Sequence, residues 1–348
     1  MTTSPHVASL TNAKPIIEKG GSSITGVGVT ELPLLERLSI RRLVLAPGAV
    51  REPHWHTNAH ELTYCLAGEA LVTVFGNESE HHRFTIRAGQ MFFAPSGSLH
   101  VIENIGGGTC ELIAAFTHED PQEFGLSGSL GVFTDAVLGN TVDQPASAFA
   151  GRRPGTEMDK IQYPEQVAVP TEDDERTDPL KFDIEAQAAP IAGPPGSAKL
   201  ARDQFWPVLA NISMYSLRIN DEGMREPHWH PVTAEMGYIA KGHARMTILN
   251  PDGSWDTYLL SPGDVYFVPR AYPHQIEVIG EEEIHFLIFF DQPTPGDIGY
   301  RATFSALRRG LLAASLGLPV RELPPLPFTA VDPLLVSKAN PTDPVTTS

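Results

Sequence analysis

The sequence has few cysteines, no long hydrophobic run and a shortage of positive charge. Only two cysteines occur in 348 residues, Cys65 and Cys110, and neither lies in a Cys-x-x-Cys motif. This argues against a disulfide scaffold and against a thiolate zinc site. No apolar run approaches the roughly 20 residues that cross a membrane, and the first residues lack the pattern of a secretory signal. We therefore expect a cytoplasmic protein.

The excess of acidic residues limits the possible partners. The chain carries 25 Lys and Arg against 42 Asp and Glu, a formal net charge of −17 at pH 7. A field of this sign argues against nucleic acid and against an anionic membrane as partners. An anionic substrate would also be repelled, so its site would need local positive charge.

The abundant residues are typical of a globular protein built from short strands. The composition is 41% hydrophobic, with 30 Gly and 31 Pro. In the first half, apolar segments separated by glycines fall at 43–45, 70–75, 84–86, 91–94 and 112–116. This spacing predicts an all-β fold, an antiparallel sandwich or barrel.

One six-residue sequence occurs twice. Arg51–His56 reads Arg-Glu-Pro-His-Trp-His and returns as Arg225–His230, at an offset of 174 residues. The same offset joins residues outside the motif, including Pro33 with Pro207, Leu35 with Leu209, Gly68 with Gly242 and Gly89 with Gly263. We interpret this pattern as duplication of a whole core domain.

The duplication sets the expected domain organisation. We expect an N-terminal domain at 15–150, a linker at 151–185, a C-terminal domain at 186–322 and an extended tail at 323–348. The linker carries a run of charges and the tail is rich in proline. Each half is expected to end in a helix, at 132–138 and at 303–315.

Each copy of the motif supplies four residues of metal-ligating type. They are His54, His56, Glu61 and His100 in the first half, and His228, His230, Glu235 and His274 in the second. Side chains alternate along a strand, so the two histidines of each His-x-His face the same way. The four residues before each glutamate can hold a turn that brings it inward on the next strand. The distant histidine returns from a later strand, after a turn that contains proline.

Imidazoles and one carboxylate suit Mn²⁺, Fe²⁺ and similar ions. An octahedral ion with four protein ligands keeps two positions open for water, oxygen or substrate. Structural zinc normally fills four positions, often with sulfur, and fits less well. His60 adjoins Glu61, but its counterpart in the repeat is Ala234, so Glu61 is the expected ligand.

Arg51 and Arg225 lie three residues before the first ligand of each copy. On an ideal strand this odd spacing turns them away from the metal, whereas a bend or bulge would let them reach it. A guanidinium beside an open metal site would clamp a carboxylate with two hydrogen bonds. The alternative is a structural ion pair with the neighbouring Glu52 or Glu226, and both interpretations stay open here.

These residues closely resemble the two motifs of the cupin family. The first motif, G-x5-HxH-x4-E-x6-G, runs from Gly48 to Gly68, and the second, G-x5-P-x-G-x2-H-x3-N, runs from Gly89 to Asn104. The second copy departs from the pattern at Gly223, Ala271 and Val278 but keeps all four ligands. The resemblance implies two tandem double-stranded β-helix (jelly-roll) barrels with short flanking helices.

Two cupins in one chain, each with Arg-Glu-Pro-His-Trp-His, resemble the bicupin oxalate decarboxylases over roughly residues 15–320. The resemblance implies Mn²⁺ in both sites, oxalate bound to the metal and held by an arginine, and formate and CO2 as products. It also implies O2 that is not consumed, a lid carboxylate that supplies a proton, and a homotrimer or homohexamer.

The lid is where the sequence departs most from that family. A Ser-Glu-Asn-Ser-like segment is expected after the last core strand, but 292–299 contains no glutamate. Asp297 stands at about the right position, and we assign it the proton-donor role. The matching stretch of the first half carries only Glu123. This favours the second half as the catalytic one, with Arg225, Asp297 and Arg51 as the catalytic residues.

Three other functions stay open. The altered lid favours an oxalate oxidase that makes CO2 and H2O2, because a radical without a proton donor is more readily oxidised. Some bicupins are Fe²⁺-dependent dioxygenases of aromatic substrates. A metal-binding bicupin without catalytic activity is the non-enzymatic alternative.

Overall fold

The described chain forms two compact units. The computed structural model describes residues 4–151, 155–340 and 342. The first unit comprises residues 9–186 and 203–211, and the second unit comprises the rest of the described chain. Residues 152–154, 341 and 343–348, which belong to the expected linker and tail, lie outside the described residues.

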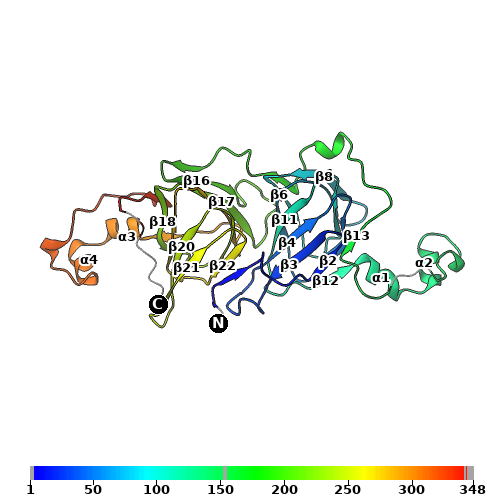
Figure 1. The fold of residues 1–348 in the computed structure, drawn as a ribbon, viewed down its shortest axis with the longest axis horizontal. Helices are drawn as coiled ribbons and strands as arrows, with labels where there is room; N and C mark the ends of the chain where they lie inside the picture. Colours follow the sequence, from blue (N-terminus) through cyan, green and yellow to red (C-terminus); the bar gives the residue numbers. More distant parts are fainter. Residues whose placement is uncertain (1–3, 152–154, 341, 343–348) are drawn as a thin grey trace. The chain divides into compact units, whose positions relative to one another are not determined.

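Two antiparallel sheets build the first unit (Figure 1). One sheet has the order β14 (Lys181–Asp183), β9 (Gln90–Ala94), β6 (Glu61–Ala67), β11 (Cys110–Phe116), β4 (Ser39–Leu45), β3 (Ser22–Val27) and β2 (Ile17–Lys19). The other has the order β12 (Glu123–Gly125), β5 (Val50–His56), β10 (His100–Asn104), β7 (Glu69–Phe75) and β8 (His81–Arg87), and β13 (Ile161–Gln162) also pairs with β5.

The second unit repeats this arrangement. Its first sheet has the order β1 (Val7–Ser9), β22 (Asp264–Val268), β19 (Glu235–Lys241), β24 (Ile284–Phe290), β17 (Ser213–Ile219), β16 (Gly196–Ala201) and β15 (Ile191–Gly193). The other has the order β21 (Trp255–Leu260), β20 (Ala244–Leu249), β23 (His274–Val278), β18 (Gly223–Trp229) and β25 (Ile298–Gly299), and β26 (Leu335–Ser337) also pairs with β18. The prediction of two tandem all-β barrels is confirmed.

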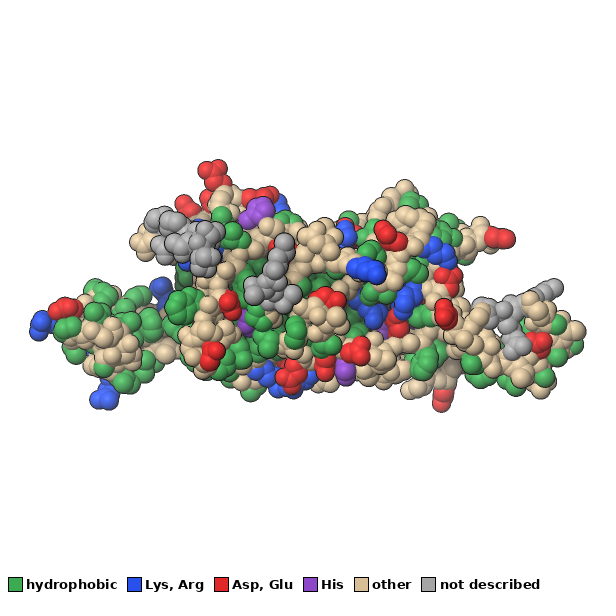
Figure 2. Space-filling model, turned by 60° about the horizontal axis from the view of Figure 1, so that its bottom comes forward, with side chains coloured by type: hydrophobic (Ala, Val, Ile, Leu, Met, Phe, Trp, Pro, Cys, Tyr) green, Lys and Arg blue, Asp and Glu red, His purple; other side chains and the backbone are tan. Residues whose placement is uncertain are grey.

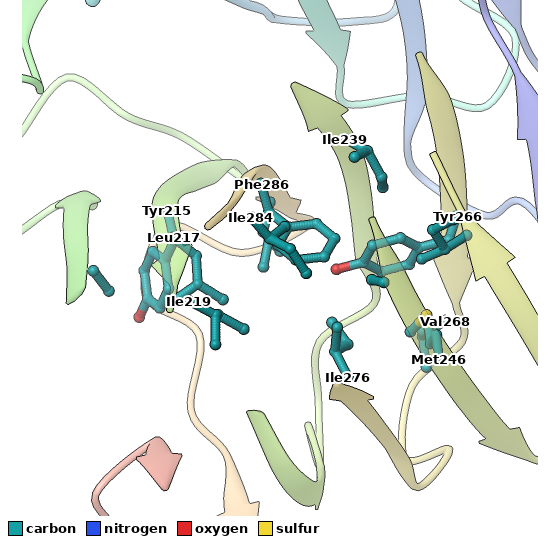
Figure 3. Packing of buried hydrophobic residues seen from close by; sticks show 14 of the residues in the cluster. Tyr215, Leu217, Ile219, Ile239, Met246, Tyr266, Val268, Ile276, Ile284 and Phe286 are labelled. Carbon is teal, nitrogen blue, oxygen red and sulfur yellow. The ribbon is translucent and has the colours of Figure 1, made fainter. Parts of the chain in front are cut away.

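The core of the second unit lies between its two sheets. Strand β24 reads Ile-His-Phe-Leu-Ile-Phe-Phe, and every residue in it is buried, as expected for a central strand covered on both faces. Leu217 and Phe286 of one sheet belong to the same buried cluster as Met246 and Ile276 of the other (Figure 3). This packing gives the strands that carry functional residues a rigid support.

The turn before the last histidine of each motif is preserved despite a substitution. Gly97 has a φ of 81°, and Ala271 at the same place in the repeat has a φ of 63°. The Gly97 N–H donates to the His56 carbonyl at 2.8 Å, and the Ala271 N–H donates to the His230 carbonyl at 2.9 Å. The same hydrogen bond therefore holds both turns, although left-handed backbone costs alanine roughly 1–2 kcal/mol.

Short helices extend from the sheets of each unit (Figure 1). They are α1 (Leu126–Val132), α2 (Asp135–Thr141) and η1 (Ala146–Ala148), with η2 (Asp173–Glu175), in the first unit, and α3 (Tyr300–Ala306), α4 (Arg309–Ser315) and η3 (Val320–Glu322) in the second. Hydrophobic side chains gather on the extension that holds α3 and α4 (Figure 2), where Leu311 is exposed, and Val137 is exposed on α2. Among the described residues, no helix has the length and hydrophobicity needed to cross a membrane.

The expected single helix at 303–315 is wrong. Helix α3 ends at Ala306, and Leu307 is extended, with φ −74° and ψ 144°. Helix α4 then buries Leu312 against Leu323, a cluster that also contacts Phe304 and Leu307. Tertiary packing of two short helices therefore overrides a sequence whose helix propensity is continuous. The expected helix at 132–138 likewise spans the break between α1 and α2.

Candidate metal centres

Each set of four predicted ligands comes from three strands of one unit. In the first unit, His54 and His56 lie at the end of β5, Glu61 begins β6 and His100 begins β10. His54 and His100 face each other across the β5–β10 ladder. In the second unit, His228 and His274 face each other in the same way across β18 and β23. His230 follows β18 directly and Glu235 begins β19.

The structure brings all eight residues together as two buried clusters. Within each cluster one nitrogen or oxygen per residue can be chosen so that all four atoms lie within 4.8 Å of one another. In the first cluster, Glu61 Oε2 lies 3.0 Å from His56 Nε2 and 3.3 Å from His100 Nε2. In the second, Glu235 Oε2 lies 2.8 Å from His230 Nε2 and 3.4 Å from His274 Nε2. The separations are those of a site that could hold one metal ion.

Backbone carbonyls set the orientation of the imidazoles. Five of the imidazoles donate from Nδ1 to a backbone carbonyl at 2.8–3.0 Å. The pairs are His54 with Glu52, His100 with Ser98, His228 with Glu226, His230 with Gly296, and His274 with Tyr272. Because a carbonyl can only accept, Nδ1 carries the proton and the Nε2 lone pair is free to bind a metal. His274 Nε2 is buried without a hydrogen-bond partner in the described chain.

The protonation states also suit a metal ion. Burial, and then the charge of the nearby arginine, holds the pKa of His54 and of His228 well below its usual value, so both imidazoles are neutral. Burial alone would raise the pKa of Glu61 and of Glu235, but the facing imidazoles outweigh it and hold both pKa values well below the usual range. Neutral imidazole and ionised carboxylate are the forms that bind metal.

A β-bulge brings both arginines to the side of the metal ligands. Opposite β10, Arg51 pairs with Ile102 and His54 with His100, so β5 holds one extra residue between these pairs. Strand β18 has the same irregularity between Arg225 and His228. The extra residue reverses the facing expected from odd spacing. Both guanidinium groups are buried, at 2% and 4% side-chain exposure.

Each arginine forms an ion pair with a carboxylate from the segment that follows the last core strand of its unit. Arg51 Nη2 donates to Glu123 Oε2 at 2.6 Å, and Arg225 Nη2 donates to Asp297. Arg51 Nη1 also donates to the Lys160 carbonyl at 3.3 Å, and Arg225 Nη1 donates to the Leu334 carbonyl at 2.8 Å. These partners replace the neighbouring glutamates that the structural alternative invoked.

The first unit surrounds its carboxylate with more positive charge than the second. Glu123 also accepts from Arg41 Nη1 at 2.7 Å and from Lys160 Nζ. Burial would raise the pKa of Glu123, but Arg51, Arg41 and Lys160 outweigh it and hold this pKa far below its usual value. At an offset of 174 residues, Arg41 and Lys160 correspond to Tyr215 and Leu334, which carry no charge.

Sequence reasoning passed over two of these residues, Arg41 and Lys160. It did identify Glu123, which lies 174 residues before Asp297, as the only carboxylate in the matching stretch of the first half. No comparable signal marks Arg41 or Lys160, because their counterparts are of another type. A cavity of about 190 Å³ borders Arg41 and the segment 119–121 that precedes Glu123.

Comparisons with known proteins agree with this geometry. The cupin family profile matches residues 8–143 and 203–322. The oxalate decarboxylase OxdC of Bacillus subtilis is 30% identical over 318 residues, which cover 87% of this chain and 79% of the relative. A probable oxalate decarboxylase of Arthroderma benhamiae is 24% identical over 308 residues, covering 85% and 74% of the two chains.

Solved structures give the same result. A structure of the Bacillus subtilis oxalate decarboxylase, studied for its Mn(II) centres, has a TM-score of 0.83 and 27% identity, covering 97% of this chain and 90% of its own. A structure that addresses substrate binding and a reaction specificity switch in oxalate decarboxylase has the same TM-score of 0.83 and the same identity of 27%.

Proposed function

Because the chain belongs to the cupin family and to its oxalate decarboxylase branch, we propose that it converts oxalate to formate and CO2 with Mn²⁺ at its two sites. The arginine–carboxylate pair beside each cluster is the observation that carries the proposal. In this reaction the C–C bond of the oxalate dianion breaks, one carboxylate leaves as CO2, and the other carbon gains a proton to become formate.

The two clusters supply the residues that would hold the metal. They are His54, His56, Glu61 and His100, and His228, His230, Glu235 and His274. Three imidazoles and one carboxylate suit Mn²⁺, and Fe²⁺ would also be accepted. When bound, Mn²⁺ would supply a Lewis-acidic, redox-active centre for oxalate and for O2, which we include as a co-reactant without net consumption.

The arginine beside each cluster is suited to the far carboxylate of the substrate. A guanidinium binds a carboxylate with two parallel hydrogen bonds, and a buried one does so without competition from water. In the structure each arginine is already paired with a carboxylate of the chain, Arg225 with Asp297 and Arg51 with Glu123. Oxalate therefore exchanges with the carboxylate of the chain, which is then released beside the reacting carbon as a candidate proton donor.

Asp297 is the carboxylate that can leave more easily. Its side chain is 23% exposed and the only ion pair it forms in the described structure is with Arg225. Glu123 is 8% exposed and pairs with three cations, so its release breaks more ion pairs. A carboxylate whose pKa is held so low is also a poor acid at neutral pH. We therefore assign decarboxylation to the second site, with Arg225 and Asp297 as its catalytic residues.

The state of Glu123 favours oxidase chemistry as a second candidate, confined to the first site. Oxalate bound beside Arg51 would meet a Glu123 carboxylate that Arg41 and Lys160 keep ionised and in place, so this carboxylate would be a poor proton donor. The two electrons of oxalate would then pass to O2, and two CO2 and one H2O2 would form with uptake of two protons. Formation of H2O2 by the first site would be the minor activity of the protein.

An assay that reads formate and H2O2 together tests the assignment. Asp297→Ala should lose most formate and gain H2O2, because substrate still binds but the proton donor is gone. Glu123→Ala is the matched variant and should keep most formate. Unchanged formate in Asp297→Ala, or its loss in Glu123→Ala alone, would contradict the assignment. Metal analysis of both variants shows whether the sites stay loaded.

A further inference from the structure

The two ligand glutamates are held by different hydroxyl groups. Thr63 Oγ1 donates to Glu61 Oε1 at 2.7 Å, and the Tyr266 hydroxyl donates to Glu235 Oε1 at 2.5 Å. In both sites the other oxygen, Oε2, is the one that faces the imidazoles. Each carboxylate thus has one oxygen in the cluster and one oxygen tied to a hydroxyl outside it.

These hydroxyls do not occupy equivalent positions in the repeat. The constant offset pairs Thr63 with Gly237 and Phe92 with Tyr266. Thr63 and Phe92 face each other across β6 and β9, and Gly237 and Tyr266 face each other across β19 and β22. Within one cross-strand pair, the hydroxyl has moved from one strand to its neighbour.

The glycine is required by the tyrosine. A Cβ on Gly237 would lie 2.1 Å from Tyr266 Cε1 and 2.2 Å from Cζ, so no larger residue fits at position 237 while the tyrosine ring holds this position. Figure 3 shows the Tyr266 ring reaching inward from its strand among Ile239 and Phe286. Both members of the pair have therefore changed together, and the change kept the hydrogen bond to the glutamate.

Burial explains why this hydrogen bond has a strong influence. Thr63 and Tyr266 are both 0% exposed, so each hydroxyl needs a partner inside the protein. Hydrogen bonds from outside the coordination sphere orient metal ligands, and their loss typically costs 10–100-fold in metal affinity. A carboxylate with both oxygens free can also turn and bind a metal through both, which would take a position that oxalate needs.

We propose that Tyr266 and Thr63 are positioning residues that hold one oxygen of each ligand glutamate, so that only the other oxygen is presented to the metal. The inference rests on the proposed function in taking the clusters as metal sites. Neither residue touches the substrate in this role. Each acts through the glutamate, and the two sites reach the same arrangement by different residues.

Full-length protein loaded with Mn²⁺ provides the test. In Tyr266→Phe, the electron paramagnetic resonance signal of one of the two Mn²⁺ ions should change, and that ion should bind 10–100-fold more weakly. Thr63→Val should do the same to the other ion. The control is Tyr238→Phe, which removes a tyrosine hydroxyl from the neighbouring strand β19. It should leave the signals and the affinities of both ions unchanged.

A transplant of the first site's arrangement sharpens the test. The double variant Gly237→Thr/Tyr266→Phe should restore the signal and the affinity that Tyr266→Phe loses. Threonine then supplies the hydroxyl, and the phenylalanine ring moves aside to lie as Phe92 lies opposite Thr63. Thermal melting shows which variants are folded. If the Tyr266 variants do not fold, Thr63→Val alone tests whether the hydroxyl positions the ligand glutamate.

Two results would overturn the inference. One is that folded Tyr266→Phe or Thr63→Val keeps both signals and both affinities. The other is that a folded double variant remains as weak as Tyr266→Phe. Both readouts are independent of turnover, so they decide this inference even if the protein makes no formate. The absence of formate would overturn only the proposed reaction.

Discussion

In the proposed function, Arg225 is the residue that would bind oxalate at the second site. Its two Nη atoms donate in different directions, to Asp297 and to the Leu334 carbonyl. Lysine carries a compact ammonium group without the planar fork of a guanidinium, so it cannot clamp a carboxylate with two parallel hydrogen bonds. We expect Arg225→Lys to raise the KM for oxalate about tenfold, which corresponds to roughly 1.4 kcal/mol, with metal content unchanged.

Steady-state kinetics and metal analysis on the same preparation check this expectation. Arg51→Lys is the matched variant at the first site and should change the KM far less. Loss of metal in proportion to the loss of activity would show that Arg225 maintains the cluster rather than binding substrate.

At the residue scale, the sequence predicts ligands better than it predicts their surroundings. The candidate ligands could be predicted because side chains alternate along a strand and because the repeat keeps the same spacing in both copies. The side of the strand that Arg51 and Arg225 face could not be predicted. A bulge reverses it, and neither copy of the sequence shows where the bulge lies. The exchange of hydroxyls between Thr63 and Tyr266 depends on a cross-strand contact that spacing alone does not contain.

At the element scale, both units pair two short strands with the strand that carries the arginine, but only the first unit adds charged side chains that hold the carboxylate. Strand β12 begins with Glu123 and pairs with β5, and β13 pairs with β5 directly after Lys160. Lys160 and Arg41 therefore anchor Glu123 from two different segments. In the second unit, β25 and β26 pair with β18 in the corresponding way, but Tyr215 and Leu334 supply no charge.

Exchange of these two anchors should make the first site resemble the second. In Arg41→Tyr/Lys160→Leu, the pKa of Glu123 rises toward its usual value and the carboxylate is released more easily. We expect formate from the first site to increase severalfold in a His228→Ala background, where the second site is inactive. The measure is formate per H2O2 under saturating oxalate, with His228→Ala alone as the control. An unchanged ratio would show that the anchors do not limit the first site.

The elements themselves were predicted with uneven success. The all-β class and its duplicated barrels followed from glycine spacing and the repeat. The segment expected to be a linker contributes β13 and β14, which add to the sheets of the first unit. Their residues, Ile161–Gln162 and Lys181–Asp183, are too few and too polar to show strand periodicity. Only pairing with β5 and β9 makes them strands.

At the scale of the whole molecule, the repeat gives each unit a complete set of candidate metal ligands. All four members of each set come from one unit, so neither site needs a residue of the other. The net charge of −17 repels oxalate from the chain as a whole. The buried arginines are the local positive charge that the proposed substrate would require, and each is paired with a carboxylate of the chain.

Because the ligand sets are separate, the two metals should be removable one at a time. We expect His54→Ala and His228→Ala each to lose about one of two metal ions per chain, since each removes one of four ligands. Activity should fall unequally. His228→Ala should lose most formate production, and His54→Ala should keep most of it, because Asp297 lies at the second site.

Stability should follow the same division. A metal ion at a hundredfold excess over its Kd stabilises the unit that binds it by about 2.7 kcal/mol. Calorimetry with and without Mn²⁺ should therefore show that His54→Ala loses the metal-dependent shift of one unit and keeps that of the other, and His228→Ala should show the reverse. If either variant loses both metals or both shifts, the two sites are coupled. Equal loss of formate in both variants would show that decarboxylation is shared rather than assigned to the site that contains Asp297.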